Sequence, residues 1–525
     1  MDLKKEVKNN QNKEINNKFI NLNKNSQKEI KNINGLKNIT EEQREKTKKY
    51  SVLDGSSYNV MAGFGEQFIP AFAIKLGATN SEIGILSSFP TFVASLFQIL
   101  SAKVTDTVKK RKLIMLIGVF IQALTWLPMF IVPFLTKNIL ILTLIFSIYV
   151  LCGYFVNPAW NSLMGDIVKE NERGIYFGKR NKILGITSFF SILSAGLILN
   201  FFTEINVWLG FSILFTIAML ARFFSWYFLS KHTEPLYIVE EKDSFTFTEF
   251  IKKLPHTNFG KFVIFRSLMI FSIMIAAPFF VVYMLNHLHF SYLQYTIIIL
   301  TPLIVRFFTS TYWGKYSDKY GNKRIMTVSS LILFLIPIGW LTAAIFNGNF
   351  FLIMLAEAIS GFGWAGFDLS TFNFIFDAVS PRKRARCIAY FNVVFGAFVL
   401  IGGLIGGYLS TRLSSGVYSL IILFLVSAML RLLVQLTFLP MIKEERVHVM
   451  VDDRKLFIEM VAVRPTRYLF NETLDGIIKI EDEIKRLGKG SFKFMVKEID
   501  EVIADINTMS KSKRKKSKPK KKKKK

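Results

Sequence analysis

The stretch GKYSDKYGNKR, residues 314–324, is a charged loop between two long apolar blocks. It contains one Asp between two glycines and ends in a basic pair. A second charged loop, AKVTDTVKKRK at residues 102–112, also separates two apolar blocks. Their aspartates, Asp106 and Asp318, lie 212 positions apart, so a similar loop recurs at one place in each half of the chain.

The correspondence continues on both sides of these loops. Unrelated apolar helices would match only Leu and Phe, whereas here prolines and loop charges match. The matching pairs are Pro90 with Pro302, Lys103 with Lys315 and, after a slip of one residue, Asp166 with Asp377, Arg173 with Arg384 and Asn181 with Asn392. The sequence therefore predicts a duplicated chain, and parallel six-helix repeats with a site at their interface are a transporter architecture.

Apolar blocks separated by short charged clusters run from Tyr58 to Pro440. Each block is about as long as the roughly 20-residue helix that a bilayer core requires. Because no water reaches the backbone there, each block is predicted to be a helix. The fold class is thus an all-α polytopic membrane protein with twelve transmembrane helices in two pseudo-symmetric six-helix bundles. The expected spans are 57–75, 83–101, 113–135, 138–157, 180–202, 207–229, 262–285, 291–312, 325–346, 350–375, 388–410 and 417–439.

Lys and Arg residues concentrate in alternate loops, which indicates the cytoplasmic side. The loops after the second, fourth, eighth and tenth spans are basic, whereas the opposite loops hold only Lys75, Lys137 and Arg412. Both termini are therefore predicted to be cytoplasmic. The expected parts are a disordered arm (1–50), a first bundle (51–230), a cytoplasmic linker (231–261), a second bundle (262–442), a helical appendage (443–510) and a disordered polybasic tail (511–525).

The net charge of +29 comes in part from the last fifteen residues, which hold twelve Lys or Arg. This tail is expected to attract anionic lipid headgroups, and no nucleic acid is expected as a partner. The sequence offers no metal-ligand cluster, no phosphate-binding loop and no nucleophile–base pair. Neither a cofactor nor an enzymatic activity is therefore predicted.

Loop 314–324 resembles the loop signature of the major facilitator superfamily, which recurs between the second and third helices of each half. The first copy, with Ala102 in place of the first Gly, is a degraded version. Residues 160–178 also resemble bacterial members of uncharacterised subgroups of this superfamily, and this resemblance implies a bacterial plasma (inner) membrane. The resemblance implies two six-helix bundles around a central cavity that work by alternating access.

In that family the loop clamps one half against the other on the cytoplasmic side. Glycine permits a tight turn, and an Asp near a helix end can bond to backbone N–H groups or pair with Arg. The alternative for each charge is plain positive-inside topology. The residues expected to form this cytoplasmic gate are Asp106, Gly314, Asp318, Lys319, Gly321, Lys323 and Arg324, with Asp166, Arg173, Asp377 and Arg384.

Two further helices bear on the subclass. Drug–proton exporters of this family carry an Arg in the fourth helix and a Gly-Pro motif in the fifth. Here the fourth span has no charged residue, and the fifth reads SAG at 194–196 without Pro, which argues against that subclass. The eleventh span is rich in glycines that are expected to allow close helix packing; they are Gly402, Gly403, Gly406 and Gly407.

Ionisable residues within the predicted spans are candidates for function, because a charge at mid-bilayer costs about 2.5–3.5 kcal/mol on insertion scales. Glu66, near the middle of the first span, is suited to bind a proton, a cation or a substrate donor, or to be a neutral structural group. Arg306 lies in the eighth span, and Glu357 and Asp368 lie in the tenth. These three are expected either to form a structural ion pair or to hold a charged substrate or a coupling proton.

Four more residues lie near the cytoplasmic ends of spans. Asn157 and Trp160, near the cytoplasmic end of the fourth helix, are candidates for lining the cavity, with an interfacial anchor as the alternative for the Trp. Arg222 and Arg431, in the sixth and twelfth spans, are expected to snorkel toward the headgroups.

The leading hypothesis is a secondary active transporter that moves a small-molecule substrate across the plasma membrane, with a proton or a sodium ion as the coupling ion. Export of drugs or other amphiphiles is the second hypothesis, which the Phe-rich spans favour. The third is a transporter-like membrane receptor or assembly partner that acts through the cytoplasmic tail. Deletion of residues 446–525 separates the third from the first two, because transport would survive it.

Overall fold

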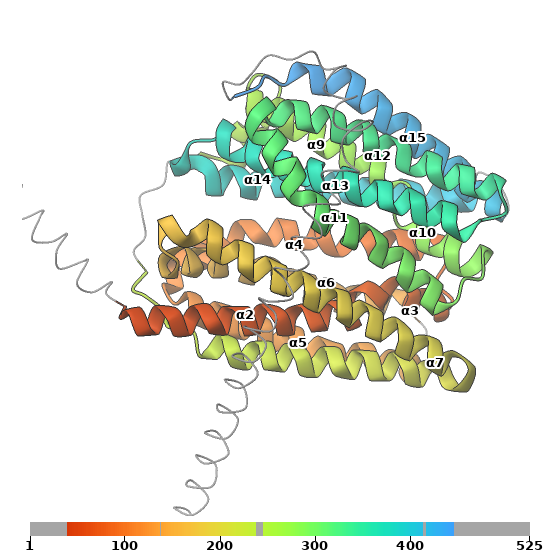
Figure 1. Cartoon of the computed structure of the whole chain (residues 1–525), viewed down its shortest axis with the longest axis horizontal. Helices are drawn as coiled ribbons and strands as arrows, with labels where there is room; N and C mark the ends of the chain where they lie inside the picture. Colours follow the sequence, from red (N-terminus) through yellow and green to blue (C-terminus); the bar gives the residue numbers. More distant parts are fainter. Residues whose placement is uncertain (1–38, 137, 238–244, 413–415, 446–525) are drawn as a thin grey trace, which may run out of the picture. The chain divides into compact units, whose positions relative to one another are not determined.

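The computed structural model describes residues 39–136, 138–237, 245–412 and 416–445. Within these ranges the chain forms helices and no strand (Figure 1). The polybasic tail, nearly all of the predicted appendage and residues 1–38 of the predicted arm lie outside the described residues.

Each half of the chain forms one group of helices. The first group comprises α2 (Glu41–Phe64), the 3-10 turn η1 (Glu66–Phe68), α3 (Ile69–Lys75), α4 (Asn80–Val108), α5 (Arg111–Leu135), α6 (Ile139–Ile167) and α7 (Arg173–Ser230). The second comprises α9 (Asn258–Met274), α10 (Phe279–Val282), the π-helical turn η3 (Tyr283–His287), α11 (Tyr292–Tyr320), α12 (Asn322–Ile345), α13 (Phe350–Ala378), α14 (Pro381–Arg412) and α15 (Val417–Phe438). The short helix α8 (Phe247–Lys253) lies in the linker between them.

The predicted number of spans agrees with these helices. Ten helical stretches among the described residues are long and apolar enough to cross a membrane. One stretch contains α7, which joins two predicted spans across Asn206, where the backbone leaves helical geometry (φ −164°, ψ 100°). The first predicted span is divided by η1 into parts of α2 and α3. Splitting α7 and adding this interrupted span gives the twelve predicted spans in two bundles.

The predicted arm is wrong at its C-terminal end, because α2 begins at Glu41. A capping box starts this helix: Thr40 accepts a hydrogen bond from the Gln43 backbone, and the Gln43 side chain accepts one from the Thr40 backbone. Thr47 and Tyr50, which follow, are buried. The cap and the burial together make residues 41–50 helical, although their polar composition predicts disorder.

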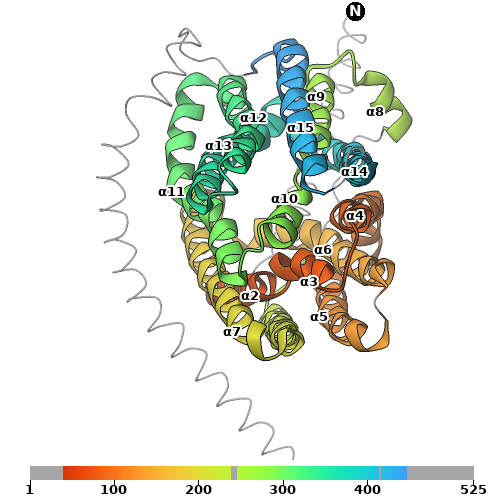
Figure 2. The ribbon, with the colours of Figure 1, turned by 90° about the vertical axis from the view of Figure 1, so that its right-hand side faces the viewer.

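Packing inside each half and between the halves follows the duplication. In the first half α2 packs on α7, and α5 packs on α6 and α7; in the second half α11 and α12 pack on α13, and α15 packs on α9 and α12. The halves meet mainly through two helix pairs, α4 with α14 and α7 with α11. Seen from one end, α3 of the first group and α10 of the second lie where the two groups meet (Figure 2).

The glycines of α14 are points of close helix approach, as predicted. A Cβ atom on Gly403 would lie 2.8 Å from the carbonyl oxygen of Gly84 on α4, in the other half. A Cβ atom on Gly402 would lie 2.6 Å from the carbonyl oxygen of Phe271 on α9. Both distances are shorter than van der Waals contact, so α14 needs glycine on two of its faces.

The aligned arginines of the repeat make the same contacts in both halves. The Arg173 guanidinium donates to the carbonyl oxygens of Gly165 (2.9 Å) and Val168 (3.3 Å), at the end of α6. Arg384 donates to those of Phe376 (3.0 Å) and Val379 (3.1 Å), at the end of α13. Each Arg thus satisfies carbonyls that a helix leaves open at its C-terminus. The repeat predicted from spacing is therefore also a repeat of hydrogen bonds.

A second repeated contact fixes the third span of each half. The Lys112 backbone N–H, at the start of α5, donates to the Glu234 carboxylate (3.2 Å). The Lys323 backbone N–H, at the start of α12, donates to the Glu444 carboxylate (2.7 Å). A carboxylate suits a helix N-terminus, where N–H groups have no partner within the helix. In both halves it comes from the segment that follows the last helix.

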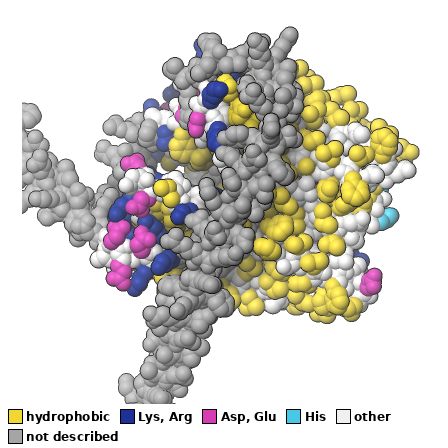
Figure 3. Space-filling view, viewed as in Figure 1, with side chains coloured by type: hydrophobic (Ala, Val, Ile, Leu, Met, Phe, Trp, Pro, Cys, Tyr) yellow, Lys and Arg dark blue, Asp and Glu magenta, His cyan; other side chains and the backbone are white. Residues whose placement is uncertain are grey.

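Apolar side chains cover much of the outer surface. Figure 3 shows them over one part of the molecule, whereas the charged side chains gather at the other. Large exposed apolar side chains include Phe201, Phe224, Phe351 and Leu433. In water such a surface would aggregate, so it is the surface expected to face lipid.

The two glycines of the charged loop, Gly314 and Gly321, are expected to differ in how substitution by Ala affects stability. Gly321 ends α11 with φ 88° and ψ 160°, a region open essentially to glycine alone. Gly314 lies inside the helix, and a Cβ there would find its nearest neighbour at an ordinary 4.0 Å, on Leu369. We expect Gly321→Ala to destabilise the protein by about 1–3 kcal/mol and Gly314→Ala to be neutral or slightly stabilising. Thermal unfolding in detergent measures both, and equal effects of the two substitutions would contradict this account.

Candidate functional site

A cavity of about 310 Å³ lies between the two halves. Tyr154 on α6 contributes from the first half, and α9, α13 and α14 contribute from the second. Its lining is largely aromatic and includes Phe262, Phe372, Phe391 and Phe395. A concave, mostly apolar site with a few polar groups is the usual form of a small-molecule site.

The charged centre of this cavity is Asp368, which two arginines contact. Arg306 Nη2 on α11 lies 2.7 Å from Asp368 Oδ2. Arg266 Nη2 on α9 lies 3.4 Å from Asp368 Oδ1. The pairing of Arg306 with Asp368 matches one of the two expectations for these residues. Glu357 does not take part, because its partner is elsewhere.

Asp368 is the one residue of this cavity lining that the sequence analysis named as a site candidate, and Arg266 and Tyr154 are among those that it missed. Arg266 lies within the predicted span 262–285, so its charge inside an apolar block was a usable signal. Its guanidinium lies over the rings of Phe367 (4.7 Å) and Phe395 (5.1 Å). Tyr154 gave no such signal, because an aromatic residue in an apolar helix is common.

Asn157 and Trp160 differ in their surroundings. Asn157 is exposed and accepts a hydrogen bond from Asn161 (2.7 Å). It lies three residues after Tyr154 and so shares that face of α6 with a cavity-lining residue. The Trp160 ring, in contrast, is covered by the guanidinium of Arg180, at 4.5 Å. Of the two, Asn157 is the better placed to meet a solute.

Glu66 occupies the break in the first span. Gly65 precedes it and packs so closely on Trp126 that a Cβ atom there would overlap the indole ring. The Tyr149 hydroxyl donates a hydrogen bond to the Glu66 carboxylate. Because η1 interrupts the helix at this point, the carboxylate is held at a break in the span.

A buried polar network continues from Tyr149. The Gln122 side chain donates to the Tyr149 carbonyl oxygen (2.8 Å) and accepts a hydrogen bond from Arg222. Arg222 also donates to Ser225 (2.8 Å), whose hydroxyl donates to Asp54 (2.6 Å). The side chains of Gln122, Arg222, Ser225 and Asp54 are all buried.

The expectation that Arg222 and Arg431 snorkel is therefore wrong. Arg222 is 4% exposed and Arg431 is 2% exposed. Arg431 donates to the Leu333 carbonyl oxygen (2.7 Å) inside the second bundle. Both arginines point into their bundle because they have hydrogen-bond acceptors there. Sequence position alone does not reveal such partners.

Glu357 lies in the second bundle and accepts a hydrogen bond from the Trp340 indole N–H, at 2.9 Å. Each bundle thus holds one carboxylate bonded to a large aromatic side chain: Glu66 with Tyr149, and Glu357 with Trp340. The helices that carry them do not correspond in the repeat. The duplication therefore preserves the scaffold but not these two carboxylates.

The first-half gate residues contact their own half and the linker. Arg111 is fully buried, and its Nη1 lies 2.7 Å from Asp166 Oδ2. The Tyr237 hydroxyl donates to Asp106 (2.6 Å), and the Arg111 guanidinium covers the Tyr237 ring at 4.8 Å. Burial and the bond to Asp106 raise the pKa of Tyr237 above its usual range, so its hydroxyl remains a donor.

The second-half gate residues have a related arrangement in which an amide takes the place of a guanidinium. Asn322 donates to Asp377 (2.6 Å) where the first half uses Arg111 and Asp166. Asp318, Lys319 and Arg324 lie at the junction of α11 and α12, and Lys319 Nζ lies 4.8 Å from the Tyr320 ring. A clamp between the halves, as the family resemblance implies, stays a prediction for these residues.

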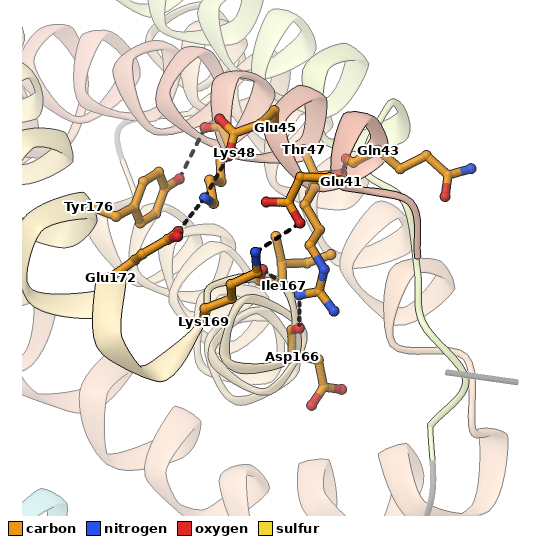
Figure 4. A network of polar contacts seen from close by, with 11 residues as sticks. Glu41, Gln43, Glu45, Thr47, Lys48, Asp166, Ile167, Lys169, Glu172 and Tyr176 are labelled. Carbon is orange, nitrogen blue, oxygen red and sulfur yellow. Dashed lines mark hydrogen bonds and ion pairs between the residues drawn. The ribbon is translucent and has the colours of Figure 1, made fainter. Parts of the chain in front are cut away.

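The early start of α2 adds a polar network at the same end of the first bundle (Figure 4). Arg44 donates to the carbonyl oxygens of Asp166 (2.9 Å) and Ile167 (2.8 Å), which end α6. Lys48 Nζ lies 2.7 Å from Glu172, in the turn between α6 and α7. This hydrogen bond lowers the pKa of Glu172 below its usual value. The N-terminal part of α2 is therefore bonded to the α6–α7 turn.

The described hydrogen bonds between the halves lie mainly towards the opposite end, where α3 and η3 are. Tyr295 donates to the Gln67 carbonyl oxygen (2.8 Å), Ser81 to that of Gly407 (3.2 Å), and the Leu293 backbone to Asn200 (3.3 Å). Nearer the cavity, the Asn392 side chain donates to that of Gln98 (2.7 Å).

Comparisons with known proteins define the class. The Major Facilitator Superfamily model matches residues 57–273 and again residues 262–473. These two matches cover most of the chain and each corresponds to about one half. The chain belongs to the Major Facilitator Superfamily and is a multi-pass membrane transporter.

Curated relatives match over short stretches. MFS-type transporter ppz2 of Metarhizium majus (strain ARSEF 297) is 32% identical over 120 residues, 23% of this chain and 20% of that protein. Multidrug resistance protein 3 of Bacillus subtilis (strain 168) is 35% identical over 102 residues, 19% of either chain. The chain thus spans about a fifth of the length of these relatives.

Solved structures agree on the fold. A variant of the nucleoside transporter NupG superposes with a TM-score of 0.59 at 16% identity, over 76% of this chain and 100% of that one. The POT family transporter PepTSo gives 0.59 at 11% identity, over 78% and 100%. At these identities the likeness concerns the fold alone.

His232, directly after α7, predicts a pH dependence of stability. It is 1% exposed, and burial lowers its pKa; Asp54 opposes this effect, and Lys112 and Arg180 add to it. Because the unfolded histidine binds a proton near pH 6.5, the folded state loses stability as the pH falls below about 6.5.

We expect His232→Gln to reduce the loss of thermal stability between pH 7 and pH 5, by an amount of order 1 kcal/mol. The matched control is His256→Gln, at an exposed histidine. The measurement is thermal unfolding across this pH range. An equal loss in the His232 variant and the unaltered protein would show that His232 plays no part.

Proposed function

We propose that this protein is a secondary active transporter that moves a small solute by alternating access, with the cavity at Arg266 and Asp368 as its substrate site. The observation that carries the proposal is the position of the cavity between the halves, with lining residues from both. A solute bound there touches both bundles, so a change in their contact changes its access.

The distribution of contacts supports a definite state. The inter-half bonds of Tyr295, Ser81 and Leu293 lie at the end that the loop charges predict to be extracytoplasmic. Two residues that line the cavity, Phe262 and Ile375, lie near the start of α9 and the end of α13. The loop charges predict that both of these helix ends are on the cytoplasmic side. The arrangement fits a conformation that is closed on the outside, with its substrate site in the cytoplasmic half. Cytoplasmic termini are part of the same proposal.

Glu66 is the proposed coupling group. It lies at a helix break and bonds to Tyr149, which belongs to another helix of the same bundle. A carboxylate at such a position can bind and release a proton while its surroundings shift. Coupling to a proton gradient is therefore the preferred form of the mechanism, and sodium is the alternative.

Export of amphiphiles is the second candidate. The aromatic lining of the cavity favours it, since such a lining accommodates apolar solutes. The partial similarity to Multidrug resistance protein 3 points the same way, although it covers only 19% of that protein. Measuring solute movement in both directions distinguishes uptake from export.

The test is solute flux in liposomes that contain the purified protein, with a panel of solutes and with or without a pH gradient. Movement of at least one solute beyond that in protein-free liposomes is expected. Failure of every solute to move would count against the transporter mechanism proposed here.

Glu66→Gln is expected to affect gradient-driven accumulation and solute exchange differently. Gln keeps the shape of Glu66 but cannot release a proton, so accumulation driven by the pH gradient should be lost while solute exchange continues. Glu357→Gln, whose amide oxygen can still accept the Trp340 hydrogen bond, is the comparison at a second carboxylate within the spans. Loss of gradient-driven uptake in this variant alone would move the coupling role from Glu66 to Glu357. Unchanged gradient-driven uptake in the Glu66 variant would remove this residue from the coupling mechanism.

A further inference from the structure

We infer that the cavity selects organic anions with an apolar body and that Arg266 binds their anionic group. This inference rests on the proposed substrate site and adds the chemical class of the solute.

The charges at the cavity do not balance. Two guanidinium groups, of Arg266 and Arg306, contact the single carboxylate of Asp368. The three side chains together carry a formal charge of +1. Arg266 is only 11% exposed, whereas Arg306 is 47% exposed, so solvent screens the charge of Arg306 more than that of Arg266. A mostly buried charge that shares its counter-ion with a second arginine is costly, and a bound anion offsets this cost.

Arg266 lines the cavity and has one donor without a partner. Its Nη1 atom is buried and has no hydrogen-bond partner among the described residues, whereas Nη2 contacts Asp368. The side chain is 11% exposed and lines the cavity. A buried donor without a partner is unfavourable, and a carboxylate or phosphate oxygen would satisfy it with a charge-assisted bond.

The guanidinium is also held in place before any ligand binds. Phe367 and Phe395 lie against it at 4.7 and 5.1 Å, and Trp364 lies at 5.9 Å. Stacking on aromatic rings fixes the plane of an arginine and leaves its edges for hydrogen bonds. Because the donor is already oriented, little conformational entropy is lost when an anion binds.

The rest of the cavity fits an apolar body. Phe262, Phe372, Ile375 and Phe391 form much of the wall, and Asn392 is one of its few polar side chains. A sugar or another polyol would leave many hydroxyl groups without partners here. A cation would meet the excess positive charge. An aromatic or aliphatic monoanion meets neither obstacle, and the volume of about 310 Å³ suits a small one.

Three probes with one phenyl body isolate the charge: phenylacetate, phenylacetamide and phenethylamine, which are an anion, a neutral molecule and a cation at pH 7. Binding to the purified full-length protein is measured by ligand-induced thermal stabilisation. We expect phenylacetate to bind at least tenfold more tightly than the other two.

Two substitutions should act in opposite directions on phenylacetate. Arg266→Gln removes the free donor and the excess charge, so the affinity should fall at least tenfold. Asp368→Asn removes the competing carboxylate, so the affinity should rise. Arg412→Gln, on the exposed last turn of α14 and outside the cavity lining, should leave it unchanged. A merely structural role for Arg266 and Asp368 would make both cavity variants weaker binders.

The inference fails if phenylacetate binds no better than the amide or the amine, or if Arg266→Gln binds it as well as the unaltered protein. Flux in liposomes separates this failure from failure of the proposed function. Movement of the amine or the amide without the anion would leave a transporter with a different substrate class. Absence of movement for every solute of the wider panel would remove the transport mechanism itself.

Discussion

Polar groups in the hydrocarbon core of a bilayer have no water to bond with, and this constraint explains most of the described contacts. Arg222 reaches Gln122 and Ser225, and Arg431 reaches a backbone carbonyl oxygen, although both lie near helix ends. Each is directed into its bundle because a bonded interior is better than an unbonded one. Several buried donors have no partner among the described residues, including the Nε atoms of Arg222 and Arg431. The Nη1 donor of Arg266 differs from these because its side chain lines the cavity.

The duplication supplies a scaffold, and the differences between its copies supply the chemistry. Arg173 and Arg384 close corresponding helix ends with corresponding bonds. The charged centre of the cavity, in contrast, comes wholly from the second half, while Glu66 belongs to the first. A charged centre in one half and a coupling group in the other would be linked only through the contact between the halves. The two helix pairs α4–α14 and α7–α11 form most of that contact.

Hydropathy was sufficient to predict the helical class and the number of spans, because the thickness of the bilayer core sets the length of each apolar block. The recurrence of loop charges along the sequence was sufficient to predict the two halves. Helix ends were less accessible: α2 begins at Glu41 owing to a cap and to burial that composition does not reveal. The pairing of Arg306 with Asp368 was one of two open alternatives, since a charge inside a span says nothing of its partner. Arg266 was overlooked although its charge was visible, and Tyr154 had no distinguishing signal.

The central claim is that the two halves change their contact so that the cavity opens to one side at a time. Pulsed electron paramagnetic resonance tests this with two spin-label pairs in a background without the native cysteines. One pair, Glu170 with Ser380, reports on the predicted cytoplasmic end, and the other, Leu135 with Ile345, reports on the opposite end; all four side chains are exposed. As the pH is changed or a transported solute is added, we predict that one distance lengthens while the other shortens. Two distances that stay fixed, or that change in the same direction, would contradict alternating access.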